Sequence, residues 1–160
     1  MESQKQAKGK MNMKARMNYR SANPQAFQAM IKLEGYVQEC GLEKSLMELI
    51  KIRASQINGC AFCLDMHTKD ARKLGETEQR IYLLSAWREA AFYTDAERAA
   101  LALTEAVTTI SVGGVSDELY EEVRKHFDEK QFVSLIMAIN VINAWNRLAI
   151  TTGMTAPAEL

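Results

Sequence analysis

The chain has few of the residues that mark several large classes of protein. It contains only 2 prolines and 3 cysteines in 160 residues, and 20 acidic residues balance 20 basic ones. Without an excess of positive charge it has no global field that would attract nucleic acid or an anionic membrane, so we expect neither as a partner. An odd, small number of cysteines argues against the disulfide framework of a small secreted domain and favours a reducing, cytoplasmic location.

The N-terminal segment also lacks the features of an export signal. Its first ten residues, MESQKQAKGK, are polar and basic and contain no apolar run. A signal peptide or a membrane span requires such a run. We therefore expect residues 1–20 to be a polar, flexible lead. Residues 21–160 are expected to be one domain, because a chain that is 48% hydrophobic can bury a core of its own.

Apolar residues recur at helical spacing along most of the chain, and no segment has a convincing strand pattern. Capping residues and glycines mark the expected ends of the helices. The expected helices span residues 24–41, 43–57, 60–74, 77–89 and 94–110, a short segment after 116, and 128–151. Short connections between them favour antiparallel neighbours, so the sequence predicts an all-α, compact bundle of about seven helices.

The most informative segment contains Cys60, Cys63 and His67, directly after Gly59. At positions i, i+3 and i+7 the three reactive side chains project from one face of a helix. Gly59 is expected to end the preceding helix, which places the cysteines near a helix N-terminus. Unpaired amides and the helix dipole favour a thiolate there. The pattern therefore indicates a redox-active dithiol.

Other interpretations of the two cysteines are weaker. A c-type haem attachment needs histidine directly after the second cysteine, where this chain has Leu64. A structural zinc site needs four ligands, and only Cys40 and His126 are available to complete one. The cysteines could also pack as small apolar residues, as we expect for Cys40. None of these accounts for their position after a helix-ending glycine.

With Glu48, which lies twelve residues before Cys60, these residues form the order E…CxxCxxxH. This order resembles the signature of AhpD-like alkylhydroperoxidases, which belong to the carboxymuconolactone decarboxylase superfamily. The stretch NAWNR at 143–147 is also similar to a recurring feature of small members, and the resemblance extends from about residue 20 to 155. It implies an all-helical AhpD-like fold that assembles as a homotrimer or homohexamer.

Carried over to this chain, the resemblance implies that Cys63 attacks peroxide and that Cys60 resolves the oxidised product. Glu48 and His67 would be the pair that handles protons. The best-known members carry a second histidine inside the CxxC motif, where this chain has Phe62. The chain thus lacks the residue that extends the proton relay in those members.

The resulting prediction is a thiol-dependent peroxidase that reduces hydroperoxides and is regenerated by an external dithiol reductant, with no metal and no bound cofactor. Two alternatives remain open. One is a carboxymuconolactone decarboxylase-like lyase acting on a small lactone acid, whose branch resembles the fold without the CxxC motif. The other is a non-enzymatic, redox-sensing oligomer, which would be oxidised slowly and without turnover.

Several of these side chains also have purely structural interpretations. A glutamate on an amphipathic helix is usually solvated or ion-paired, and for Glu48 the nearby partners are Lys51 and Arg53. Asn143 and Asn146 interrupt an apolar run, and we expect them to anchor a neighbouring loop or subunit through hydrogen bonds. Apolar positions are spread widely over the helices and include the aromatic residues at 87, 92, 93 and 145. They provide more hydrophobic surface than one small bundle needs to bury, which favours burial of part of it between subunits.

Overall fold

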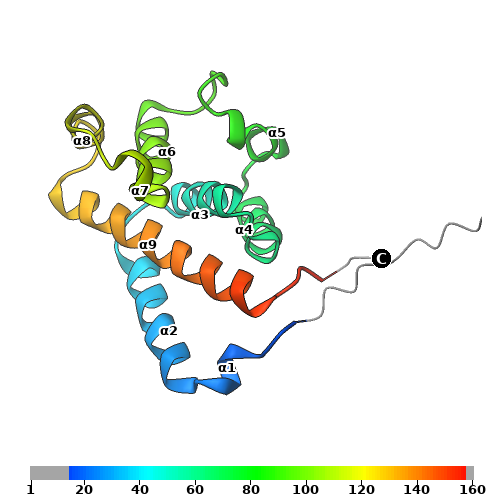
Figure 1. Cartoon of the computed structure of the whole chain (residues 1–160). Coiled ribbons are helices and arrows are strands. Elements are labelled where there is room, and N and C mark those ends of the chain that lie inside the picture. Colours follow the sequence, from blue (N-terminus) through cyan, green and yellow to red (C-terminus); the bar gives the residue numbers. More distant parts are fainter. Residues whose placement is uncertain (1–14, 158–160) are drawn as a thin grey trace, which may run out of the picture.

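The computed structural model describes residues 15–157, and within this range every regular element is helical (Figure 1). The helices are α1 (Tyr19–Ala22), α2 (Pro24–Glu39), α3 (Lys44–Asn58), α4 (Ala61–Lys73), α5 (Glu78–Tyr82), α6 (Asp95–Thr108), α7 (Ile110–Gly113), α8 (Asp117–Arg124) and α9 (Glu129–Thr152), with a 3-10 turn, η1, at Leu84–Ala86. The predicted all-α fold is confirmed. Most of the predicted lead at residues 1–20 lies outside the described residues.

Local capping determines where the main helices begin and end. The side chain of Asn23 accepts a hydrogen bond from a backbone amide in the first turn of α2, and Thr94 and Asp128 open α6 and α9 with complete capping boxes. Gly59 ends α3 in the left-handed conformation, with φ of 69°. These are the boundaries that the sequence predicted.

The predicted helix at 77–89 is wrong in length, because α5 ends at Tyr82 and only η1 follows it. Tyr93 supplies a physical reason. Its hydroxyl donates to the carbonyl of Arg80, the group that would accept from the Leu84 amide if α5 continued. Farther along, the guanidinium of Arg98 donates to the carbonyls of Trp87, Arg88 and Ala90 in the irregular segment. The two additional helices, α1 and α7, have four residues each and were not predicted.

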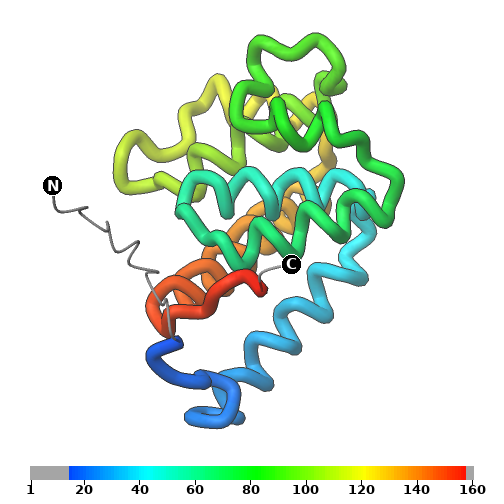
Figure 2. Tube along the Cα trace, turned by 90° about the vertical axis from the view of Figure 1, so that its right-hand side faces the viewer, coloured from blue at the N-terminus to red at the C-terminus, as the bar shows by residue number. Residues whose placement is uncertain are grey.

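Helix α3 lies at the centre of the bundle and contacts α4, α6 and α9. Leu49, Ile50 and Ile52 on α3 are fully buried, as are Leu135 and Ile139 on α9. Burial of each such side chain contributes about 1.5–3 kcal/mol to folding. The C-terminal half of α9 lies between α4 on one side and α2 on the other (Figures 1 and 2).

Helix α9 is also long and apolar enough to cross a membrane, judged by length and composition alone. Half of its most apolar window is buried inside the protein. The helix contacts α2, α3, α4, α6 and α8. This packing is that of the core helix of a globular bundle.

Side-chain amides of half-buried Asn58 and of buried Asn143 and Asn146 join the end of α3 to α9. The side-chain amide of Asn58 donates to Oδ1 of Asn143 and to Oδ1 of Asn146, both at 2.9 Å. Asn146 in turn donates to Oγ of Ser55 at 3.0 Å. We call Asn58, Asn143 and Asn146 the asparagine clamp. Asn143 and Asn146 were expected to anchor a neighbouring loop or subunit, and in the structure they anchor the C-terminal end of α3 in the same chain. The clamp fixes the turn that leads into the cysteines.

Candidate active site

Cys60 and Cys63 are joined by a disulfide at the start of α4. Their Cα atoms are 5.4 Å apart, which is within the usual range for such a bond. Cys60 is the N-cap residue, and its Sγ accepts a hydrogen bond from the Cys63 amide at 3.4 Å. Both cysteines are almost completely buried. The capping position therefore brings the two sulfurs together at a helix N-terminus.

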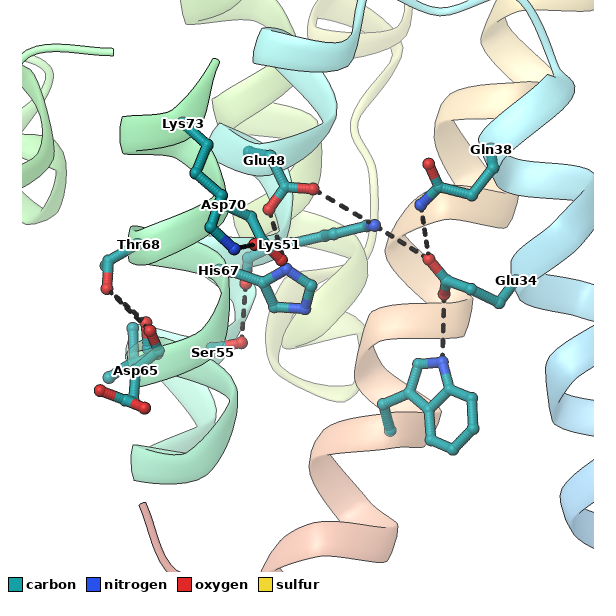
Figure 3. Close-up of polar contacts among 12 residues, drawn as sticks. Glu34, Gln38, Glu48, Lys51, Ser55, Asp65, His67, Thr68, Asp70 and Lys73 are labelled. Carbon is teal, nitrogen blue, oxygen red and sulfur yellow. Dashed lines mark hydrogen bonds and ion pairs between the residues drawn. The ribbon is translucent and has the colours of Figure 1, made fainter. Parts of the chain in front are cut away.

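Glu48 on α3 and His67 on α4 face each other across the interface of these helices (Figure 3). The distance between Oε2 of Glu48 and Nδ1 of His67 is 2.8 Å, and both side chains are buried. An ionised carboxylate can only accept, so Nδ1 is the donor and Nε2 is left as the basic nitrogen. His67 lies one helical turn beyond Cys63. The structure thus brings the four predicted site residues together.

Lys51 forms an ion pair with Glu48, and its side chain is almost completely buried. Its Nζ lies 3.5 Å from Oε1 of Glu48 and 3.0 Å from Oε1 of Glu34 on α2 (Figure 3). Arg53, the other partner that the sequence offered, pairs with Glu105 instead. Lys51 therefore links the Glu48–His67 pair to a third helix.

Glu34 is the site residue that sequence reasoning missed. Burial alone would raise the pKa of its carboxyl. The charge of Lys51 and hydrogen bonds from Gln38, Lys51 and Trp145 together outweigh burial and hold this pKa below its ordinary value. The only sequence signal was that Glu34 continues the stripe of Phe27 and Ile31 on α2, where a further apolar residue would be expected.

A cavity of about 640 Å³ opens beside this network, between α2 and α4. Cys63, Glu48 and His67 all line it. Its apolar walls include Tyr19, Phe27, Ile31, Phe62, Met66 and Trp145. Its size is that of a site for a small organic molecule. A reactive sulfur, a buried acid–base pair and an apolar binding space therefore share one location.

The sequence profile named Carboxymuconolactone decarboxylase family matches residues 24–106, which include the disulfide, Glu48 and His67. The chain belongs to this family. It is 50% identical over 147 residues, 92% of this chain and 100% of the relative, to YdfG, a Bacillus subtilis protein of uncharacterised function.

Solved structures of similar proteins share the fold. A protein of unknown function from Agrobacterium tumefaciens, linked by name to the antioxidant defence protein AhpD, is 49% identical. Its TM-score is 0.89, with 91% of this chain and 100% of that chain covered. A peroxidase-related protein from Ralstonia eutropha, described as an alkylhydroperoxidase AhpD core, is 22% identical with a TM-score of 0.77 over 87% of this chain and 74% of its own. The family member described here therefore has the AhpD-like fold.

In this member of the carboxymuconolactone decarboxylase family, Phe62 contributes apolar wall where better-known members have a second histidine. The described residues contain one group of side chains with metal-ligand spacing: Glu48, His67 and Asp70, whose donor atoms lie within 4.8 Å of one another. Lysines already pair with both carboxylates, Lys51 with Glu48 and Lys73 with Asp70. These ammonium groups compete with a cation for the same oxygens.

We predict that Lys51→Met lowers the free energy of unfolding at pH 7 by about 3 kcal/mol, because it removes the cation from a buried ion pair. The pKa of Glu34 is held below 4.5, so its contribution is complete above that pH and is lost as the pH falls through the lowered value. Denaturant unfolding should therefore show the wild type and the variant converging in acid. Lys130→Met, an exposed change, is the control. A stability gap that does not vary with pH would contradict this account.

Proposed function

We propose that this family member is a thiol-dependent peroxidase that reduces organic hydroperoxides through a Cys60–Cys63 dithiol/disulfide cycle. The observation that carries the proposal is the position of Cys63. It lines the cavity, is bonded to Cys60 and lies one turn from the buried Glu48–His67 pair. Such an arrangement has a nucleophile, a second thiol and an acid–base group around a single binding space.

The cycle has three steps. In the reduced protein His67 takes the proton of Cys63, and the thiolate attacks the terminal peroxide oxygen. The sulfur–oxygen bond forms as the oxygen–oxygen bond breaks, and the departing alkoxide takes the proton back from His67. The products are an alcohol and a sulfenic acid on Cys63. The thiolate of Cys60 then displaces hydroxide, which leaves as water after protonation, and an external dithiol reduces the disulfide by exchange.

Proton delivery supplies more of the rate than ionisation of the thiol. A free thiol is about 3% ionised at pH 7. Lowering the pKa of such a thiol increases the thiolate fraction, but intrinsic nucleophilicity falls at the same time with a Brønsted slope of about 0.4–0.5, so the net gain is small. Protonation of the departing alkoxide has no such penalty. This is the step that the Glu48–His67 pair is placed to assist.

The direct test is hydroperoxide consumption by the wild-type protein with and without a dithiol reductant. The proposal requires turnover only with the dithiol, one alcohol per dithiol oxidised, and a Cys60–Cys63 disulfide in alkylation mass spectrometry after peroxide treatment. Freely alkylated Cys60 and Cys63 would contradict it. Oxidation that stops after one round despite excess dithiol would favour the redox-sensing alternative. Decarboxylation of a lactone acid that survives loss of both cysteines would favour the lyase.

We further propose a cytoplasmic homotrimer or homohexamer. Trp87 and Tyr93, which the sequence offered as subunit contacts, are buried within the monomer. The support comes instead from exposed apolar side chains such as Leu33 and Tyr36 on α2 and Val133 on α9. Light scattering should give a mass several times the 18.0 kDa of one chain. A monomer at micromolar concentration would contradict the assembly.

A further inference from the structure

The charges that line the cavity do not balance. Three carboxylates line it, and each is paired with a lysine: Glu34 and Glu48 with Lys51, and Asp70 with Lys73. Two more cations, Arg20 and Lys44, line the same cavity, and neither makes an ion pair with any other residue between positions 15 and 157. The wall therefore has positive charge without a protein counter-ion.

Of these two cations, Lys44 lies some distance from the sulfur of Cys63 along the cavity, so it could bind one end of a substrate whose other end reaches that sulfur. Helices α3 and α4 pack against each other in opposite directions, and the Glu48–His67 contact fixes their register. Cys63 therefore lies level with Lys51, one turn from that contact. The first residue of α3, Lys44, is about 10 Å away along the helix axis.

Apolar side chains line the cavity at the level of Cys63 and between that level and Lys44. Met66 on α4 lies one turn beyond Phe62, and Ile31 lies one turn beyond Phe27 on α2. Arg20, in contrast, stacks on the rings of Tyr19 and Phe27. A ligand that fits this arrangement has an apolar body and one anionic end. Hydrogen peroxide has neither.

We propose that the substrate is an amphipathic organic hydroperoxide with a carboxylate, such as a fatty-acid hydroperoxide. Its carboxylate contacts Lys44, and its peroxide group reaches Cys63. This inference rests on the proposed function and names its substrate class. The apolar body lies along Phe62, Met66 and Ile31, where its burial removes hydrocarbon from water.

The test compares linoleic acid hydroperoxide with its methyl ester, which has the same body and peroxide group without the charge. We expect kcat/KM to be roughly fivefold higher for the acid than for the ester, because an exposed ion pair such as that of the substrate carboxylate with Lys44 contributes about 1 kcal/mol. Salt screens such a pair, so the ratio should fall at high salt. Lys44→Gln should bring the acid-to-ester ratio close to one. Lys32→Gln, an exposed lysine on α2 that does not line this cavity, is the matched control and should keep the ratio.

Cumene hydroperoxide, an uncharged third substrate, separates the two possible failures. If all three peroxides are consumed with dithiol but the acid and the ester react equally, the carboxylate site is wrong and the peroxidase function stands. If none is consumed, both proposals fail. A ratio that is lost in Arg20→Gln and kept in Lys44→Gln would overturn the assignment of the carboxylate to Lys44.

Discussion

Cys63→Ser is expected to abolish peroxide reduction, whereas Cys60→Ser should still perform one round of it. Cys63 lines the cavity, so in the proposed cycle it is the sulfur that attacks peroxide. Without Cys60, the sulfenic acid on Cys63 has no neighbouring thiol to condense with, so in the absence of any added thiol the protein stops after one equivalent. A burst measurement with substoichiometric protein should give no alcohol for the first variant and one alcohol per chain for the second. A sulfenic-acid-specific reagent should label only the second.

Cys40→Ser is the matched control for these two variants. Cys40 is a free thiol at the C-cap of α2, where its sulfur donates to the carbonyl of Val37. Its replacement should leave turnover and the burst unchanged. If Cys60→Ser loses the first round while Cys63→Ser retains it, the two cysteines have the opposite roles. A burst that depends on Cys40 would place the chemistry outside the cavity.

Glu48→Gln is expected to lower peroxide turnover by about 10²–10⁴, the usual contribution of a general acid–base group. The variant keeps the side-chain shape, but its amide no longer provides an anionic partner for Nδ1 of His67 and the ammonium group of Lys51. Oxidation by diamide requires no protonation of an alkoxide, so it should be affected much less. Both rates and the melting temperature are to be measured on the same preparation.

Glu105→Gln provides the comparison for a carboxylate with a structural role. Glu105 accepts hydrogen bonds from Arg53, Trp87 and Arg88 and does not line the cavity. The Glu105→Gln substitution should lower the melting temperature, while the peroxidase rate per folded molecule stays constant. If Glu48→Gln behaves in the same way, or slows peroxide and diamide oxidation equally, Glu48 does not act as a proton relay.

The sequence predicted those parts of the molecule that depend on neighbours along the chain. Capping boxes and Gly59 placed the helix ends. The spacing of Cys60, Cys63 and His67 predicted a common helix face, and the resemblance of the E…CxxCxxxH order added Glu48, which the short turn between the two helices brings beside them. The length of the helix after Thr77 was wrong, since Tyr93, a residue beyond this segment, donates a hydrogen bond to the carbonyl of Arg80 within it.

The remainder of the site depends on contacts that local patterns do not encode. The sequence singled out Trp145 as part of the stretch 143–147, but it did not predict that Trp145 contacts the site. Its indole donates to Oε2 of Glu34 across 111 residues of sequence. This contact exists only because α2 packs along α9. The cavity wall on α2 therefore could not be derived before the helices were placed.

The asparagine clamp limits how far a change in the oxidation state of the cysteines can alter the structure around them. It fixes the last residue of α3 to α9 through neutral amides, and neither protonation at neutral pH nor a change in the oxidation state of sulfur alters their hydrogen-bonding capacity. We therefore expect the turn that carries Cys60 to keep its position when the disulfide is reduced. Reduction and reoxidation in the proposed cycle should then leave the surrounding helices in place, so we expect the oxidation state of the cysteines not to alter the outer surface of the molecule.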